Sequence, residues 1–252
     1  MKLSKITIDI SSNNIELLED NELPVYNFNN KKCKIDFDLI KYFLKKFGII
    51  IFKNFYTKNE LELMDKEIQK LEDELLQSKT KYVEGCNGDF RLFHVEKKSQ
   101  ILQEMITDKS IFNKIASFYK HPTHWNKKLL LNKVVHNNVV SSSGGGWHRD
   151  NHHCQFKTLV YMSDVELGNG NFQFIVNSTI KNIGIPPHWS YNDTRYADET
   201  IDDLLRDNTN DCKLYDIMGE TGTVVFFDAT NIHRGKVIEK GERVALTQYY
   251  FT

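Results

Sequence analysis

The chain has 252 residues, of which 40% are hydrophobic and 27% are charged, a balance typical of a folded globular protein and not of a disordered one. Its 33 basic and 34 acidic residues give a formal net charge of −1, which argues against non-specific capture of nucleic acid or of an anionic membrane. We therefore expect neither nucleic acid nor a membrane as a partner.

Cysteine usage and the N-terminus favour a cytoplasmic protein. The chain contains no CxxC pair, and a scaffold of disulfides or a zinc site needs clustered cysteines. We also find no apolar signal region at the N-terminus and no run near the ~20 apolar residues that a membrane span needs. We expect four reduced thiols, at Cys33, Cys86, Cys154 and Cys212.

Helices dominate the prediction from about residue 36 to 120. The run Gly48–Phe55 is strand-like, and Thr57 follows it three residues before Glu60, the spacing of a capping box at a helix start. A second helix is predicted from Asp108, as its cap, to about Tyr119. The apolar positions of the two helices are Leu61, Met64, Ile68, Leu71 and Leu75, and Ile111, Ile115 and Phe118.

Strands dominate from about residue 128 onward, because short apolar or aromatic runs alternate with turn signals such as Gly168–Asn171. This pattern predicts a β-sandwich or barrel. Ser141–Gly146 is expected to be a flexible loop, and the polar segment Pro186–Asn210 a lid over a site. The predicted strands are Leu129–Val140, Phe156–Val165, Asn171–Val176, Cys212–Met218, Thr223–Asp228 and Arg243–Phe251.

A metal site is indicated by His148 and Asp150. Residues two apart on a strand point to the same face, so both can reach one ion while Arg149 points away. His233 is the best candidate for a third ligand, because it follows the strand-like run Thr223–Asp228. Two imidazoles and one carboxylate leave three positions of the metal open, an arrangement that suits Fe(II) oxygenases.

Arg243 follows His233 by ten residues, after a predicted hairpin bracketed by Gly235 and Gly241. Its guanidinium is then expected inside the barrel, beside the metal. A buried arginine is costly unless it meets an anion, and its planar fork matches a carboxylate. 2-Oxoglutarate fits this pattern, since its keto-acid end chelates iron while its distal carboxylate reaches the arginine.

Several motifs together resemble the phytanoyl-CoA dioxygenase-like family over about residues 36–252. They are His148-Arg-Asp150, Tyr161-Met-Ser-Asp-Val165, Gly170-Asn-Phe-Gln173, His233-Arg-Gly235 and Gly241-Glu-Arg243, together with the strand and helix that begin at Gly48 and Thr57. The resemblance implies a double-stranded β-helix, a mainly β jelly-roll with flanking helices. It also implies one oxygenase domain over residues 1–252, with a helix-rich part to about 127 and the β-helix core from about 128.

The resemblance further implies a dioxygenase that uses Fe(II), 2-oxoglutarate and O2 to hydroxylate a small molecule, with release of succinate and CO2. The expected metal ligands are His148, Asp150 and His233, and the expected 2-oxoglutarate contacts are Arg243 and the Thr158 hydroxyl. Related halogenases replace the carboxylate ligand with a small residue, whereas this chain keeps Asp150, which favours hydroxylation or another oxidation. The family's Pro-Gly-Ser-His-like turn is replaced here by Ile175–Thr179.

Some alternatives stay open at this point. His152 or His153 offers another nitrogen to the metal, as in cupin sites of the HxH type, although both more readily begin a loop at the pocket rim. A non-catalytic cupin-like binding protein and an oxygenase acting on a macromolecule are the rival functions. The residues considered as further pocket lining are Arg91, His94, Lys133 and Asn138.

Overall fold

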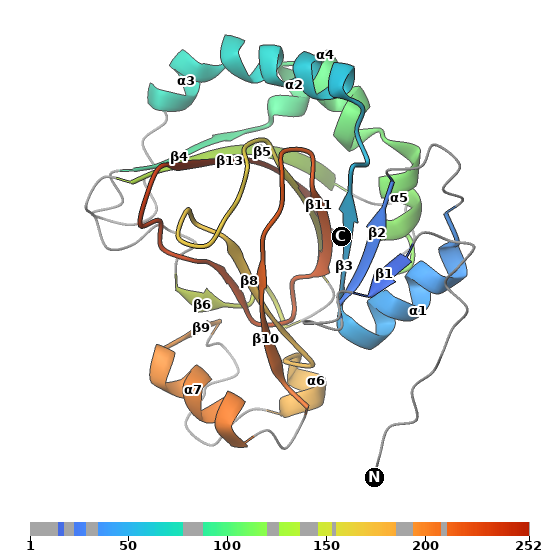
Figure 1. Cartoon of the computed structure of the whole chain (residues 1–252), viewed down its shortest axis with the longest axis vertical. Helices are drawn as coiled ribbons and strands as arrows, with labels where there is room; N and C mark the ends of the chain where they lie inside the picture. Colours follow the sequence, from blue (N-terminus) through green and yellow to red (C-terminus); the bar gives the residue numbers. More distant parts are fainter. Residues whose placement is uncertain are drawn as a thin grey trace.

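The computed structural model describes residues 15–17, 23–28, 35–77, 88–119, 126–136, 146–152, 155–184, 194–207 and 211–251. Its strands form two sheets that enclose an apolar interior, and its helices lie outside them (Figure 1). None of the helices in these ranges has the length and apolar content needed to cross a membrane.

The larger sheet has eight strands in the order β1-β2-β3-β11-β7-β13-β5-β4. Its neighbouring strands are antiparallel except for β2 and β3, which are parallel. The bounds are β1 (Ile15–Leu17), β2 (Pro24–Asn27), β3 (Ile49–Lys53), β4 (Asp89–Phe93), β5 (Asn126–Val135), β7 (Phe156–Tyr161), β11 (Val224–Asp228) and β13 (Glu242–Phe251).

The smaller sheet has five antiparallel strands in the order β10-β8-β12-β6-β9. Two of its strands carry the histidines of the predicted metal site. The bounds are β6 (Trp147–His148), β8 (Phe172–Val176), β9 (Arg195–Tyr196), β10 (Lys213–Ile217) and β12 (His233–Gly235).

The helices cover the outer faces of both sheets. In Figure 1, α2, α3 and α4 lie over the larger sheet at β4, β5 and β13, α1 and α5 lie beside β2 and β3, and α7 lies next to β9. The bounds are α1 (Phe37–Phe47), α2 (Lys58–Lys70), α3 (Glu72–Gln77), the 3-10 turn η1 (Val95–Lys97), α4 (Gln100–Leu102), the π-helical turn η2 (Gln103–Thr107), α5 (Ser110–Ala116), α6 (Ile180–Ile183) and α7 (Asp198–Asp207).

Side chains of the larger sheet alternate between two apolar clusters, as the period of a strand requires. On β11, Val225 points to the interior between the sheets, where it packs with residues such as Phe174. The next residue, Phe226, points to the helix-covered face, where it packs with Phe112 of α5. Each strand of this sheet therefore presents one set of residues to a site between the sheets and another to the helices.

The start of the predicted helix after Gly48–Phe55 is confirmed, including its capping box: the Thr57 hydroxyl accepts from the Glu60 N–H, and the Glu60 carboxylate accepts from the Thr57 N–H. The single helix expected to reach Leu75 is instead divided at Leu71 into α2 and α3. The predicted cap at Asp108 is wrong. Asp108 ends the π-helical turn η2, with its N–H bonded to the Gln103 carbonyl, and α5 begins two residues later at Ser110.

Some predicted segments differ from the expectation within the described residues. The strand predicted as Leu129–Val140 is β5, which ends at Val135, and residues 137–145 lie outside the described ranges together with most of the predicted loop Ser141–Gly146. Within the predicted lid Pro186–Asn210, residues 194–207 form β9 and α7. The lid segment is thus joined to the smaller sheet through β6.

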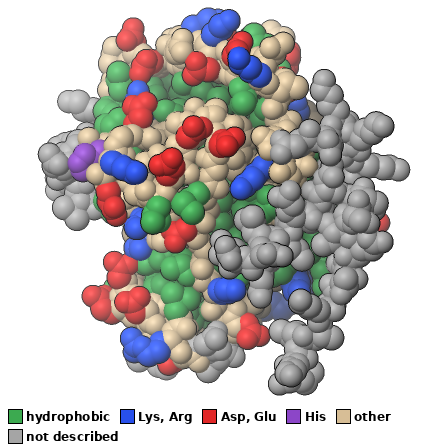
Figure 2. Space-filling model, viewed as in Figure 1, with side chains coloured by type: hydrophobic (Ala, Val, Ile, Leu, Met, Phe, Trp, Pro, Cys, Tyr) green, Lys and Arg blue, Asp and Glu red, His purple; other side chains and the backbone are tan. Residues whose placement is uncertain are grey.

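On the face that Figure 2 shows, acidic and basic side chains of the described residues are interspersed. Cys212 is a buried free thiol, and the other cysteines, Cys33, Cys86 and Cys154, lie outside the described residues.

Candidate active site

The structure brings His148, Asp150 and His233 together on the inner side of the smaller sheet. Antiparallel pairing of β6 with β12 sets His148 directly opposite His233, and their ring centroids are 4.5 Å apart. The His148 Nε2 lies 3.8 Å from Asp150 Oδ1, and the His233 Nε2 lies 3.6 Å from Asp150 Oδ2. All three donor atoms lie within 4.8 Å of one another, close enough to hold one metal ion.

Backbone hydrogen bonds orient both imidazoles. The Nδ1 of His148 lies 2.8 Å from the Gly146 carbonyl, and the Nδ1 of His233 lies 2.8 Å from the Asn231 carbonyl. Because a carbonyl only accepts, each Nδ1 carries the proton and each Nε2 presents its lone pair to the space between the three residues. Such bonds from the far ring nitrogen are typical of histidines that bind metals.

Burial and neighbouring charges together keep these groups in the protonation states that metal binding needs. Burial, together with the neighbouring His148, lowers the pKa of His233 to about 3, and burial also lowers the pKa of His148. Burial acts to raise the pKa of Asp150, but Lys157, His233 and His148 outweigh it and bring that pKa to about 2. Two neutral imidazoles and one carboxylate fit a divalent transition metal, Fe(II) among them.

Lys157 is a site residue that the sequence analysis missed. It lies on the inner face of β7, is 6% exposed, and places Nζ 2.5 Å from Asp150 Oδ2 and 4.3 Å from the centre of the Tyr249 ring. Burial acts to lower the pKa of Lys157, but Asp150 and Tyr249 outweigh it and raise that pKa. The signal in the sequence was a lysine within the apolar run Phe156–Val165.

Arg243 points into the interior from β13, as predicted. Its Nη1 donates to the Gly170 carbonyl, and its Nη2 donates to Asn132 Oδ1 at 3.0 Å. No carboxylate of the described residues forms an ion pair with it, and its Nε has no hydrogen-bond partner among them. Burial lowers the pKa of Arg243, which is the expected cost of a buried cation that only neutral groups contact.

The guanidinium of Arg243 lies beside the strand that carries His233. A Cβ on Gly235 would lie 3.0 Å from Nη1 of Arg243, so the two are neighbours across the interior. Gly235 is two residues after His233 on the same face of β12, a separation of about 7 Å along a strand. An anion bound to Arg243 therefore lies within a short reach of the three candidate ligands.

Arg149 points away from the three candidate ligands, as predicted, and is 1% exposed. Its Nε donates to the Tyr196 hydroxyl at 2.6 Å, and its Nη1 donates to the Thr230 carbonyl at 3.0 Å. Thr230 stands three residues before His233, and Tyr196 belongs to β9. Arg149 thus joins the loop of His148 and Asp150 to the loop that precedes His233.

Thr158 does not lie in this site. Its register partners, Phe226 and Gln248, lie on the helix-covered face of the larger sheet, where Gln248 accepts from Thr107 of η2 at 2.7 Å. Lys157, its neighbour, occupies the inner face instead. The expected hydroxyl contact from Thr158 to 2-oxoglutarate is therefore incompatible with its place on β7.

The other residues considered as pocket lining lie partly on the inner face and partly on the outer face of the larger sheet. Arg91 lies on the inner face of β4, where Asp89 Oδ2 is 2.9 Å from its Nη2. Lys133 lies on the outer face of β5 and pairs with Glu72 of α3 at 2.9 Å, so it does not line the interior. His94 pairs with Glu96 at 3.2 Å, and Asn138 lies outside the described residues.

The alternative nitrogen ligands are not part of the cluster. Within the described ranges, His148, Asp150 and His233 form the one group of three whose donor atoms are close enough to share an ion, and His152 is not in it. His153 lies outside the described residues.

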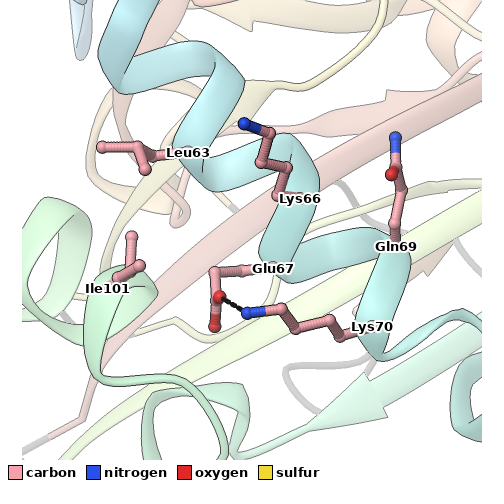
Figure 3. Close-up of a pocket in the computed structure, with 6 residues that line it drawn as sticks. All are labelled: Leu63, Lys66, Glu67, Gln69, Lys70 and Ile101. Carbon is pink, nitrogen blue, oxygen red and sulfur yellow. Dashed lines mark hydrogen bonds and ion pairs between the residues drawn. The ribbon is translucent and has the colours of Figure 1, made fainter.

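A separate hollow lies on the helix layer, between α2 and α4 (Figure 3). Leu63 and Ile101 line it on one side, and Lys70 and Glu67, which form an ion pair, also line it. It lies outside the barrel, on the other side of the larger sheet from the three candidate ligands. We therefore place the chemistry between the sheets and not in this hollow.

Known proteins resemble the chain in sequence pattern and in fold. A family model described as "Phytanoyl-CoA dioxygenase (PhyH)" matches residues 44–238 of the chain. No curated protein matches the chain in sequence.

Solved structures share the fold at low sequence identity. The non-heme alpha ketoglutarate dependent epimerase SnoN from nogalamycin biosynthesis is 12% identical, with a TM-score of 0.59 over 85% of this chain and 82% of that one. EctD from S. alaskensis with bound Fe is 15% identical, with a TM-score of 0.57 over 90% and 80%. HygX from Streptomyces hygroscopicus with nickel, 2-oxoglutarate and hygromycin B bound is 15% identical, with a TM-score of 0.54 over 83% and 84%. The predicted double-stranded β-helix with flanking helices is confirmed.

Proposed function

Because the chain belongs to the phytanoyl-CoA dioxygenase (PhyH) family, we propose that it is an Fe(II)- and 2-oxoglutarate-dependent dioxygenase that hydroxylates a small organic molecule. Succinate and CO2 are the expected co-products. His148, Asp150 and His233 hold the iron, and Arg243 binds the distal carboxylate of 2-oxoglutarate. The observation that carries the proposal is the pairing of three candidate metal ligands with a half-buried, inward-pointing arginine that has no carboxylate partner among the described residues.

The open side of the metal supports this assignment. The three donor groups come from two neighbouring strands and the loop after one of them, so they occupy one side of an ion between them. Iron held in this way supplies the oxidation chemistry, and the protein supplies ligation, orientation and a shaped cavity. Three coordination positions remain for a bidentate co-substrate and O2.

Arg243 supports the choice of 2-oxoglutarate. A charged guanidinium that meets only a carbonyl and an amide oxygen gains from a carboxylate, whose two oxygens match its planar fork. The guanidinium lies against Gly235, which is two residues, about 7 Å, after His233 along β12. A diacid that chelates the metal with one end is oriented by Arg243 at the other.

The neighbours in structure include enzymes with other outcomes, described as an epimerase and a carbocyclase. A second candidate is therefore an epimerisation or ring closure that begins with the same iron and 2-oxoglutarate. Because the chain keeps the carboxylate of Asp150, hydroxylation and epimerisation or ring closure are both favoured over halogenation. Analysis of the product distinguishes them, because hydroxylation adds one oxygen atom to the substrate and epimerisation adds none.

We further propose that the chain acts as one oxygenase domain in the cytoplasm, on a small molecule and without nucleic acid or membrane. The helix-covered core supports one domain, since it contains residues of the helix-rich part, such as Phe112, and of the strand-rich part, such as Phe226. The near-neutral charge and the buried free thiol of Cys212 support the rest.

Anaerobic titration of the metal-free protein with Fe(II) and then 2-oxoglutarate tests the proposal. The chelate gives a weak visible charge-transfer band, and we expect this band in the wild type. Arg243→Ala should need about tenfold or more 2-oxoglutarate to reach the same intensity, because it loses a charge-assisted contact. His148→Ala should bind iron much more weakly and give no band.

Arg206→Ala is the matched control, because the Arg206 side chain is 71% exposed and pairs with Asp203 on the same helix. It should titrate like the wild type. Iron binding without a band in the wild type would contradict the proposal and favour a non-catalytic metal-binding protein. An unchanged titration in Arg243→Ala would contradict the role given to that residue.

A further inference from the structure

Lys157 is a buried cation whose counter-ion is a candidate metal ligand. Its Nζ lies 2.5 Å from Asp150 Oδ2, and among the described residues it forms an ion pair with no other acid. Its side chain is 8% exposed, so water solvates it poorly. When Asp150 binds a divalent ion, its negative charge is shared with that ion, and Lys157 loses most of its compensation.

The charges of the proposed site cancel without Lys157. A divalent metal, Arg243, the Asp150 carboxylate and doubly charged 2-oxoglutarate sum to zero. Arg91 and Asp89 compensate each other through two contacts, at 3.1 and 2.9 Å. The positive charge of Lys157 is left over in a poorly solvated place, where an unpaired charge is costly.

Lys157 also lies at the other end of the interior from the 2-oxoglutarate anchor. Tyr161 marks the Arg243 end of β7, because it pairs with Ala245 of β13 and interacts with the Arg243 charge. Lys157 is four residues before Tyr161 on the same face, about 13 Å along the strand. The carboxylate held at Arg243 therefore does not serve Lys157 as well.

The neighbours of Lys157 on the inner face of the sheet are half-buried aromatic side chains. Tyr249 lies directly opposite it on β13, and the Tyr249 ring stacks on Phe251 at a centroid distance of 5.5 Å and an angle of 6°. Lys128 lies 5.3 Å from the centre of the Phe251 ring, on the same face of the sheet. These half-buried rings and cations form a wall suited to an organic anion with an apolar body.

We propose that Lys157 binds a carboxylate of the substrate, so that the enzyme acts on a small organic acid whose apolar body lies against Tyr249 and Phe251. This inference rests on the proposed function. It assigns 2-oxoglutarate and substrate to opposite ends of the interior, with the metal between them. Lys157 is then a residue that determines specificity.

Matched pairs of acids and their neutral amides test the proposal. The protein is loaded anaerobically with Fe(II) and 2-oxoglutarate, and phenylacetate and phenylacetamide, or hexanoate and hexanamide, are titrated into it. Binding is measured by calorimetry and by the shift of the charge-transfer band. We expect each acid to bind about tenfold more tightly than its amide in the wild type and in Lys157→Arg, because a charge-assisted contact is at stake.

In Lys157→Met the ratio of the affinity for the acid to the affinity for its amide should fall to about one. The affinity for the amide should stay as in the wild type. Lys127→Met is the matched control: Lys127 lies on the outer face of β5 and pairs with Asp108 at 3.2 Å, so its loss should leave the preference unchanged. The band must keep its intensity during each titration, since an acid that displaced 2-oxoglutarate would remove it. Retention of the band in Lys157→Met also shows that this variant folds.

The outcomes separate this inference from the proposed function. If the band forms but no acid binds more tightly than its amide, or if the preference survives in Lys157→Met, the inference is overturned and the proposed function stands. If no band forms in the wild type, the proposed function fails and the inference falls with it.

Discussion

Nη1 of Arg243 lies 3.0 Å from the position that a Cβ on Gly235 would take, so the guanidinium fills the space that the missing side chain leaves. The two residues belong to neighbouring elements of different sheets, β12 and β13. The motif His233-Arg-Gly235 therefore combines a candidate metal ligand with the glycine against which the Arg243 guanidinium packs. The hairpin predicted between Gly235 and Gly241 is wrong, because β12 pairs with β6 and β8 while β13 pairs with β5 and β7. The ten residues from His233 to Arg243 instead carry the chain from the smaller sheet to the larger one.

Gly235→Ala should raise the 2-oxoglutarate concentration at half-saturation about tenfold or more, while iron binding stays close to that of the wild type. The φ of Gly235 is not positive, so alanine fits the backbone there, and the effect comes from displacement of Arg243. Anaerobic titration of the charge-transfer band measures both steps. Gly146→Ala is the control, because its added Cβ would meet no atom closer than 3.9 Å. Equal 2-oxoglutarate binding in the two variants would contradict this role of Gly235.

Arg149→Lys should weaken metal binding and lower the free energy of unfolding by about 2–4 kcal/mol. Lysine keeps the charge but cannot reach both the Tyr196 hydroxyl and the Thr230 carbonyl, which Arg149 joins at 2.6 and 3.0 Å. Denaturant unfolding and iron titration measure the two effects. Tyr196→Phe removes only one of the contacts and should cause the smaller loss in each. Unchanged iron affinity in Arg149→Lys would show that Arg149 does not position the ligand loops.

Acidification should destabilise the metal-free protein through His233. Its pKa in the folded protein is about 3, below its ordinary value of 6.5, so the native state binds fewer protons than the unfolded state between these values. Stability is therefore present above pH 6.5 and is lost as the pH falls. From about pH 7 to about pH 5, His233 should cost about 2 kcal/mol, measured by denaturant unfolding. In His233→Asn this slope should be smaller by that amount, and an equal slope would contradict the assignment.

The sequence predicted that His148, Asp150 and His233 come together, but not the cation beside them. His148, Asp150 and His233 were found because alternation along a strand and the chemistry of the donor groups are both visible in the sequence. Strand β7 is buried at every position from Phe156 to Tyr161, so its pattern shows no alternation that separates the inner face from the outer one. The sequence pattern therefore could not show that Lys157 faces the interior and Thr158 the helices. Only the pairing of β7 with β11 and β13 decides which of the two faces the metal.

Contacts distant in sequence also explain why the predicted helix cap at Asp108 was wrong. Asp108 precedes an apolar pattern, as a cap would, but in the structure it ends the π-helical turn η2. A contact distant in sequence holds this turn, since the Tyr56 hydroxyl donates to the Met105 carbonyl at 3.0 Å. Lys127 forms an ion pair with the Asp108 carboxylate at 3.2 Å. The capping box at Thr57 was predictable, since both of its partners lie within four consecutive residues.

The N-terminal helix is coupled to the metal cluster through one glycine. Gly48 ends α1 with φ +71, and a Cβ there would lie 2.6 Å from the side-chain Nδ2 of Asn231. The backbone carbonyl of Asn231 orients the His233 imidazole. Gly48→Ala should therefore weaken iron binding several-fold as well as lower stability by about 1 kcal/mol.

Gly241→Ala separates the two effects. Gly241 has a similar φ of +66, but nothing lies within 4 Å of an added Cβ. Both variants should lose stability because alanine is strained in the left-handed backbone, and Gly48→Ala should lose more because its Cβ also clashes with Asn231. Only Gly48→Ala should displace Asn231 and reduce the iron affinity, as iron titration of the metal-free proteins would measure. Equal iron affinities in the two variants would mean that Asn231 absorbs the clash without moving His233.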